Sequence, residues 1–221
     1  MLPRRVLQFL IIYCLFLGLL LTLKYGLALS DYVIPAPSGI YQTALAEFRQ
    51  YSLATLNTMA VAVIGQVLAV LMAIGIGIAG RQSTWLGSFI KVAAYNFQAY
   101  PIVALASILF ILLGDGFLTR LLIAAMICYF PVLLSVLGIM SKPIDDIEHF
   151  YRATGRMRWQ LEVKIRTFEN LGQLTTVIAG SATLAMAGTI VGEFIAANAG
   201  IGYSIRIALY QSDLGKILIA L

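Results

Sequence analysis

Long apolar runs separated by short polar segments form the main pattern of this chain. Such runs lie near residues 6–28, 53–79, 92–113, 118–140 and 174–196. Each has about 20 residues or more, the length that an α-helix needs to cross a hydrocarbon core about 30 Å thick. A sixth apolar run occupies residues 210–221. The pattern predicts an all-α, polytopic transmembrane helix bundle of about five to six spans.

The composition supports a lipid environment. Of the 221 residues, 61% are apolar and 11% are charged, and the mean hydropathy is +0.92. A soluble domain of this length has too little interior to bury so much apolar surface. Arg4 and Arg5 precede the first run and the small residues Ala28 and Ser30 follow it, so a cleaved signal peptide is an alternative there. We favour an uncleaved membrane-spanning helix over residues 1–28.

The basic residues predict the orientation of the chain. Ten would face the cytoplasm if the N-terminus is inside: Arg4, Arg5, Arg81, Lys91, Lys142, Arg152, Arg156, Arg158, Lys164 and Arg166. Five would lie outside or near the outer boundary: Lys24, Arg49, Arg120, Arg206 and Lys216. This bias follows the positive-inside rule. It predicts a multi-pass protein of the cell membrane with a cytoplasmic N-terminus, a periplasmic or extracellular connection with a short helix over 29–52, and a transmembrane core over 53–221 with a cytoplasmic loop at 141–173.

Residue types exclude several kinds of chemistry. His149 is the only histidine, and Cys14 and Cys128 lie in apolar runs without metal-ligand spacing. Neither a histidine-based metal cluster nor a Ser-His-Asp triad can therefore be built. The sequence has no G-x-x-x-x-G-K-[ST] loop, so the chain is not expected to hydrolyse ATP. The net charge of +5 is spread between apolar runs, which argues against binding of nucleic acid. We expect no cofactor.

The stretch "HFYRATGRMRWQL", residues 149–161, is basic and aromatic although apolar runs flank its loop. Phe150, Ala153 and Met157 recur at helical spacing, while Arg152 and Arg156 fall on another side. This pattern is typical of a short amphipathic helix. Two interpretations remain open from the pattern alone: a helix that lies on the lipid headgroups, or a docking element for a cytoplasmic partner.

Three stretches, the second of which includes residues 149–161, occur in a recognisable order: "NFQAYPIVALASILFILLGDG" at 96–116, "YFPVLLSVLGIMSKPIDDIEHFYRATGRMRWQL" at 129–161, and "IVGEFIAANAGIGYSI" at 190–205. Their order and spacing resemble those of type I ABC importer permeases. The branch that serves sulfonates, taurine, nitrate, bicarbonate and thiamine precursors is the most similar. The resemblance covers residues 33–221 and implies the membrane subunit of an importer.

The resemblance also implies how the loop at 141–173 works. In such permeases the loop presents a coupling helix to the ATP-binding subunit. The residues that it would assign to ATPase coupling are Glu148, His149, Phe150, Tyr151, Arg152, Ala153, Thr154, Gly155, Arg156, Met157 and Arg158. The implied partners are two copies of an ATP-binding subunit, a second permease subunit in a homodimer or heterodimer, an extracytoplasmic solute-binding protein, and membrane lipid.

The chain departs from the pattern of these permeases at two places. His149, Phe150 and Tyr151 stand where a Glu-Ala-Ala motif is usual, and Leu171 and Gly172 stand where a Leu-Pro pair is common. The altered coupling surface would suit a dedicated ATPase or one member of a permease pair. The resemblance also implies about one helix more than the 221 residues contain, which a tail beyond residue 221 would explain.

Five polar or helix-breaking residues in the apolar runs are candidates for the translocation path: Asn57, Asn96, Gln98, Pro101 and Glu193. An ionisable group inside a span is costly unless it faces the protein interior or water, which favours a role for Glu193 in the path or in gating. The alternative is an interfacial glutamate held by helix caps or by Arg206. Interhelical hydrogen bonds are the alternative for the three amides, and a helix kink is the alternative for Pro101.

Three functions remain as hypotheses at this point. The first is the permease subunit of an ABC importer that moves a small solute. The second is a secondary transporter driven by an ion gradient, for which we find neither an inverted repeat nor an intramembrane ion relay. The third is a membrane scaffold whose basic loop holds a lipid or a protein. Co-purification with an ATP-binding subunit would favour the first.

Overall fold

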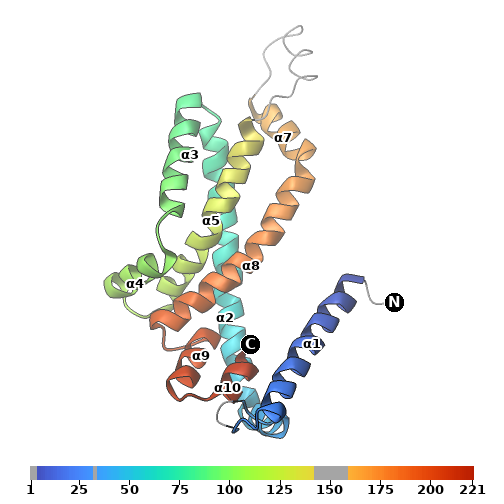
Figure 1. The fold of residues 1–221 in the computed structure, drawn as a ribbon. Coiled ribbons are helices and arrows are strands. Elements are labelled where there is room, and N and C mark those ends of the chain that lie inside the picture. The colour runs from blue at the N-terminus through green and yellow to red at the C-terminus, as the bar shows by residue number, and fades with distance from the viewer. Residues whose placement is uncertain (1–3, 32–33, 142–158) are drawn as a thin grey trace. The chain divides into compact units, whose positions relative to one another are not determined.

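The computed structural model describes residues 4–31, 34–141 and 159–221, and Figure 1 shows their ribbon. These residues form helices without any strand, which confirms the all-α prediction for the described part of the chain. The helices in chain order are α1 (Arg4–Gly26), α2 (Pro37–Gly80), α3 (Thr84–Gln98), α4 (Ile102–Leu113), α5 (Phe117–Ser141), α7 (Trp159–Glu169), α8 (Leu171–Ala196), α9 (Ile201–Tyr210) and α10 (Leu214–Ala220).

The described residues contain four helices that are long and apolar enough to cross a membrane, or five if a bent pair counts as one span. The four are Val6–Gly26 within α1, then α2, α5 and α8. They coincide with four of the predicted apolar runs, and the polytopic bundle is thereby confirmed. The sixth run contains the seven-residue α10, which residues 211–213 separate from the end of α9.

Helix α2 is longer than the sequence pattern indicates. It has 44 residues, which at 1.5 Å per residue is about 66 Å, twice the thickness of a hydrocarbon core. The prediction of a separate short helix in the 29–52 connection was wrong, because residues 37–52 continue into the second apolar run without a break. The apolar run alone could not show this, since its polar extension is equally helical.

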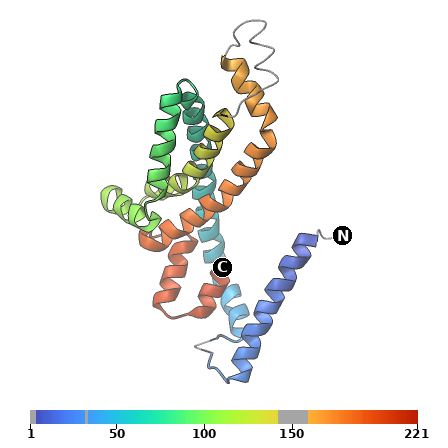
Figure 2. The same cartoon turned by 45° about the horizontal axis from the view of Figure 1, so that its top comes forward.

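The third apolar run is not one straight helix. α3 already begins at Thr84 and ends at Gln98, and α4 starts at Ile102 at an angle of 89° to α3. Figure 2 shows the green α3 and the yellow-green α4 diverging at this point. Pro101 precedes the first residue of α4; it lacks an N–H donor and disfavours helical geometry at Tyr100. A single proline therefore divides the predicted 92–113 span into two arms.

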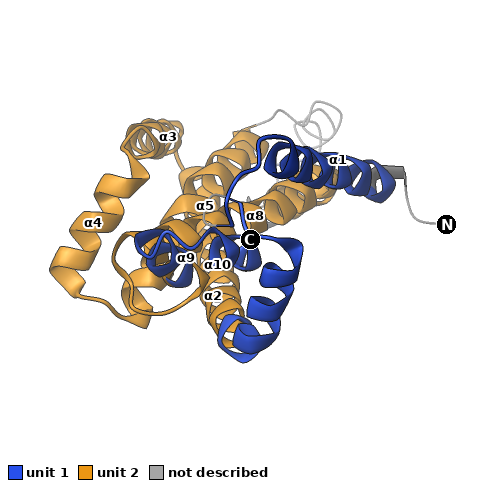
Figure 3. Cartoon of the chain, turned by 60° about the horizontal axis from the view of Figure 1, so that its bottom comes forward, with its two compact units in different colours: residues 1–52, 204–221 blue, residues 53–203 orange. Residues whose placement is uncertain are grey.

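The chain divides into two units, which are described separately: residues 1–52 with 204–221, and residues 53–203 (Figure 3). In the first unit, Lys24 is buried and forms an ion pair with Asp31 at 2.5 Å. Lys216 pairs with Glu47 at 2.8 Å. Most side chains of α1 are exposed in the chain by itself, as expected for a lipid-facing helix.

In the second unit, glycines bring α2 and α5 together. A Cβ added to Gly65 would lie 2.8 Å from the Cβ of Ala124, and one added to Gly80 would lie 2.9 Å from Leu137. The sequence numbers rise together along both helices, so α2 and α5 are parallel. Two parallel spans need a return crossing between them, and α3 with α4 is the segment that lies between them in the chain. The bent pair is therefore a broken span.

Helix α8 packs on α5 in the opposite direction. Gly188 of α8 contacts Ile127 so closely that a Cβ would collide, whereas Gly192 lies against Ile123, nearer to the start of α5. Figures 1 and 2 both show α8 running alongside α5. The amide of Gln66 on α2 donates a hydrogen bond of 2.8 Å to the carbonyl of Ile178 on α8. The three long helices of this unit thus form one core.

A charged cluster joins the end of α2 to α7. Arg81 and Arg166 both bind Oε1 of Glu162, the latter at 2.8 Å. Burial by itself raises the pKa of Glu162, but hydrogen bonds from Arg81 and Arg166 and their positive charges outweigh it and hold this pKa below its ordinary value. The carboxylate therefore stays charged and links α7 to the α2–α3 turn.

Candidate functional site

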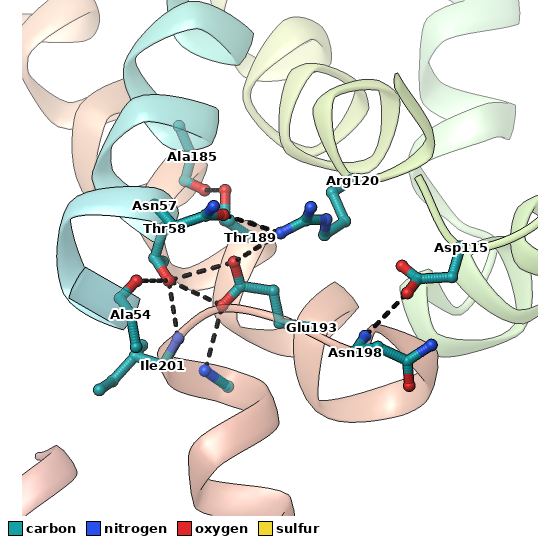
Figure 4. A network of polar contacts seen from close by, with 11 residues as sticks. Ala54, Asn57, Thr58, Asp115, Arg120, Ala185, Thr189, Glu193, Asn198 and Ile201 are labelled. Carbon is teal, nitrogen blue, oxygen red and sulfur yellow. Dashed lines mark hydrogen bonds and ion pairs between the residues drawn. The ribbon is translucent and has the colours of Figure 1, made fainter. Parts of the chain in front are cut away.

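Glu193 is the centre of a polar network inside the second unit. It lies near the end of α8, and its side chain is fully buried, with 0% exposed. The hydroxyl of Thr58, on α2, lies 2.8 Å from Oε2 of Glu193 and 3.1 Å from Oε1 (Figure 4). Thr58 is also 0% exposed. A buried carboxylate needs such donors because it has lost its hydration.

The glycine-rich turn after α8 wraps around this carboxylate. The backbone N–H of Gly202 donates to Oε2 of Glu193 at 3.1 Å, and that of Ile201 donates to the hydroxyl oxygen of Thr58 at 2.8 Å. Gly200 has φ +97°, and a Cβ on it would collide with the Glu193 carboxyl group. Side chains of α2 and α8 thus satisfy N–H groups at the start of α9 that have no partner within their own helix.

Arg120, near the start of α5, is the positive partner in the network. Its Nη1 lies 3.8 Å from Oε1 of Glu193 and donates a 2.8 Å hydrogen bond to Oδ1 of Asn57. Its side chain is 10% exposed. Residues from α2, α5 and α8 thus meet at one point, where the opposite charges of Arg120 and Glu193 offset part of the cost of burying each.

A second glycine turn approaches the same region. Gly114, with φ +74°, ends α4, and Thr119 donates to its carbonyl at 2.8 Å. Oδ2 of Asp115 accepts a 2.9 Å hydrogen bond from the backbone N–H of Asn198 (Figure 4). The α4–α5 turn, with Gly114 and Gly116, is thereby joined to the α8–α9 turn, with Gly200 and Gly202.

The structure brings only two of the five translocation-path candidates together. Asn57 and Glu193 share Arg120, whereas Asn96 is exposed and bonds to the Val92 carbonyl of its own helix at 3.0 Å. Gln98 and Pro101 lie at the α3–α4 break, where both are exposed. Whether any of the five lines the path stays a prediction.

A mostly apolar cavity of 170 Å³ lies between the broken span and α5. Phe97, Gln98, Tyr100 and Phe130 are among the residues that line it. The rings of Phe97 and Phe130 are stacked, with 5.9 Å between centroids and 8° between planes. The lining is thus mainly aromatic and aliphatic, with the amide of Gln98 as a polar group.

The residues predicted to couple to an ATPase, Glu148 through Arg158, lie outside the described residues. The helix that follows them, α7, begins at Trp159. Among residues 4–31, 34–141 and 159–221, no three His, Cys, Asp or Glu side chains gather as metal ligands.

Sequence reasoning missed part of the network around Glu193. Arg120 was assigned only to the outer boundary, although an arginine at the start of an apolar run is a signal that a buried acid lies nearby. Thr58 gives no such signal, because threonine is common in membrane helices. The role of Gly200 and Gly202 follows only from the fold, which shows what a side chain there would strike.

Comparison with known proteins identifies the family. Residues 69–221, more than half of the chain, match the sequence pattern of the binding-protein-dependent transport system inner membrane components. The chain belongs to this family. The matched region runs from the last quarter of α2 to the last residue and includes both glycine turns.

Two curated relatives are similar to this chain. The riboflavin transport system permease protein RibX of Chloroflexus aurantiacus is 36% identical over 141 residues, which cover 62% of this chain and 51% of the relative. The formylaminopyrimidine transport permease protein ThiX of Halalkalibacterium halodurans is 25% identical over 116 residues, which cover 52% and 46%. The matched part of the chain spans about half the length of these relatives.

Proposed function

We propose that this chain is the permease subunit of an ABC importer. The observation that carries the proposal is the family match over residues 69–221, a region that holds α5, α8 and the loop between them. The named roles of both relatives as transport permeases support it. A second permease subunit, homologous or identical, would complete the path, and a solute-binding protein outside the membrane would deliver the solute.

Energy for transport comes, in this proposal, from two copies of a separate ATP-binding subunit. Residues 148–158 would form the coupling helix, on the cytoplasmic side together with the N-terminus. The absence of a phosphate-binding loop from the sequence supports a partner ATPase. A secondary transporter or a scaffold would not need a partner ATPase.

The helices on either side of this segment suggest how a movement of the segment would be transmitted to the opposite end of α5 and α8. α5 ends at Ser141 just before the segment, and α7 and α8 follow it. α5 has 25 residues, about 37 Å at 1.5 Å per residue, and carries Arg120 near its other end. Glu193 lies at the corresponding end of α8. Sliding of α5 against α8 would therefore change the Arg120–Glu193 distance.

We further propose that the solute is a planar nitrogen heterocycle. The names of the two relatives give riboflavin and formylaminopyrimidine as their solutes, and both molecules have flat aromatic rings. The aromatic side chains that line the cavity beside the α3–α4 break support the same class, since aromatic faces attract flat rings more than tetrahedral sulfonates.

Reconstituted transport tests both parts of the proposal. Proteoliposomes that hold the chain with its co-purifying ATP-binding subunit should take up solute from a loaded binding protein only when ATP is present. Riboflavin or a pyrimidine should compete for uptake, whereas taurine and nitrate should not. Competition by taurine or nitrate alone would overturn the heterocycle assignment, and uptake driven by an ion gradient without ATP would overturn the importer.

The coupling segment has its own control in the same preparation. Met157→Asp places a charge where an apolar contact is expected, at a cost of about 2–5 kcal/mol if the contact is fully desolvated. The ATP-binding subunit should then be lost on purification, whereas Met157→Leu should retain it. Equal recovery with Asp and Leu would show that the segment does not dock the ATPase.

A further inference from the structure

A polar cavity of 490 Å³ lies where α2, α3, α5 and α7 approach one another, far along α5 from the Glu193 network. Basic and hydroxyl side chains line it: Arg81, Lys91, Arg166, Ser83, Thr84 and Ser88. One water occupies about 30 Å³ in the liquid, so the space can hold a hydrated anion. This cavity is separate from the apolar one beside the α3–α4 break.

One face of α3 is built toward this cavity. Thr84, Ser88 and Lys91 follow one another at i, i+4 and i+7, the spacing of a single helix face. Trp85 and Phe89, between them in sequence, are exposed and stack on each other at 5.5 Å. Two hydroxyl groups and one ammonium group thus give this helix a polar face toward the cavity.

Among the described residues that line the cavity, the charged side chains are Arg81, Lys91 and Arg166, and all three are basic. Arg81 and Arg166 share one carboxylate, that of Glu162. Lys91 forms no ion pair with any residue that the structure describes, and it is exposed. Cations that line one cavity repel one another, and an added anion relieves that repulsion.

The start of α3 adds donors on the same side. Ser83 precedes α3 with an extended backbone, and its side chain makes no capping hydrogen bond within the described residues. The hydroxyl of Ser83 therefore remains free to donate elsewhere. The first N–H groups of α3 carry the positive end of the helix dipole beside Arg81.

From this cavity, its cations and its hydroxyl stripe, we propose that the chain binds a phosphate group between α2 and α3. Lys91 and Arg81 supply the charge, while Ser83, Thr84 and Ser88 donate hydrogen bonds to the phosphate oxygens. The phosphate comes either from an anionic phospholipid headgroup or from a free phosphate. No ATP-binding subunit or transported solute is needed for this binding, so failure of the site leaves the transport proposal untouched.

Titration of the purified full-length chain in neutral detergent tests the site. The probes are short-chain phosphatidylglycerol, short-chain phosphatidylcholine and inorganic phosphate, each followed by the shift in the thermal unfolding midpoint. Phosphatidylglycerol should stabilise the wild type more than phosphatidylcholine does. Lys91→Gln should weaken this binding about tenfold, since a charge-assisted hydrogen bond is lost. Lys164→Gln, an exposed lysine of α7 outside the cavity, should bind as the wild type does.

The outcomes separate the two sources of phosphate. If inorganic phosphate competes with phosphatidylglycerol at comparable concentration, the ligand of the site is a free phosphate. If phosphatidylglycerol binds and inorganic phosphate does not, the ligand is the lipid headgroup. Ser88→Leu, which fills the cavity without changing charge, should block either probe. Equal binding by wild type, Lys91→Gln and Ser88→Leu, or equal stabilisation by both lipids without any response to phosphate, would overturn the proposal.

Discussion

Thr58 joins α2 to both α8 and α9 in the Glu193 network. Its hydroxyl bonds to the Glu193 carboxylate, on α8, and accepts from the N–H of Ile201, at the start of α9. Thr58→Val keeps the shape but leaves both partners buried without this bond, so we expect a loss of about 1–3 kcal/mol in the free energy of unfolding. Unfolding in mixed micelles by added dodecyl sulfate measures it.

The matched control for this change is Thr58→Ser, which keeps the hydroxyl and removes only a methyl group. It should retain most of the stability that Thr58→Val loses. If the serine and valine variants are equally destabilised, packing of the methyl group matters more than the hydrogen bonds, and the network is not the main support of the α8–α9 turn.

The polar network also shows the limit of sequence reasoning at this scale. Glu193 could be selected because an acid in an apolar run is costly, and Asn57 because it is an amide in a span. Their connection through Arg120 could not be foreseen, because the three residues come from three helices whose packing is decided by Gly65, Gly188 and other small side chains. Sequence shows which residues are unusual; tertiary contacts show which of them meet.

At the scale of elements, the α2–α7 link depends on the charge of Glu162. The pKa of this carboxyl is below its ordinary value because of Arg81 and Arg166, so its folded-state pKa lies below that of the unfolded chain. The link therefore stabilises α7 at pH above the ordinary glutamate range and is lost as the pH falls through the lowered value. Backbone hydrogen exchange in α7, corrected for intrinsic rates, should become faster over that fall in pH.

Two variants test this explanation. Glu162→Gln removes the charge at every pH, so α7 should exchange fast at neutral pH and show little further change on acidification. Glu169→Gln, at the exposed end of the same helix, should behave as the wild type does. A wild-type response to acid in the Glu162→Gln variant would show that another group controls α7.

The elements themselves were predictable where apolar length alone decides them. Runs 118–140 and 174–196 became α5 and α8 with boundaries moved by a few residues. The prediction failed where a single residue or a polar extension determines where a helix begins or ends. Pro101 divided one run into α3 and α4, and the polar segment 37–52 prolonged α2, because helical geometry does not stop at the edge of an apolar run.

At the scale of the molecule, the direction of the spans follows from contacts within residues 53–203. α2 and α5 are parallel, and Arg81 at the end of α2 lies beside Glu162 of α7. The ends of α2 and α5 therefore face the same side, and α3 with α4 must carry the chain across the membrane despite its 89° bend. Single cysteines at Gln82, Gly116 and Lys164, in a Cys14→Ala, Cys128→Ala background, test this topology.

Each of these positions accepts a side chain without disturbing the fold. Gln82 and Lys164 are exposed, and a Cβ on Gly116 would meet no atom within 4 Å. Gln82→Cys and Lys164→Cys should share one side, and Gly116→Cys should lie on the other. With a cytoplasmic N-terminus, a membrane-impermeant maleimide added to intact cells labels only Gly116→Cys.

Labelling of Gly116→Cys alone would therefore support both the crossing and the orientation. Labelling of only the other two would reverse the orientation but keep the crossing. Labelling of Gln82→Cys and Gly116→Cys from the same side would make the bent pair a re-entrant loop, and it would contradict the parallel packing of α2 on α5.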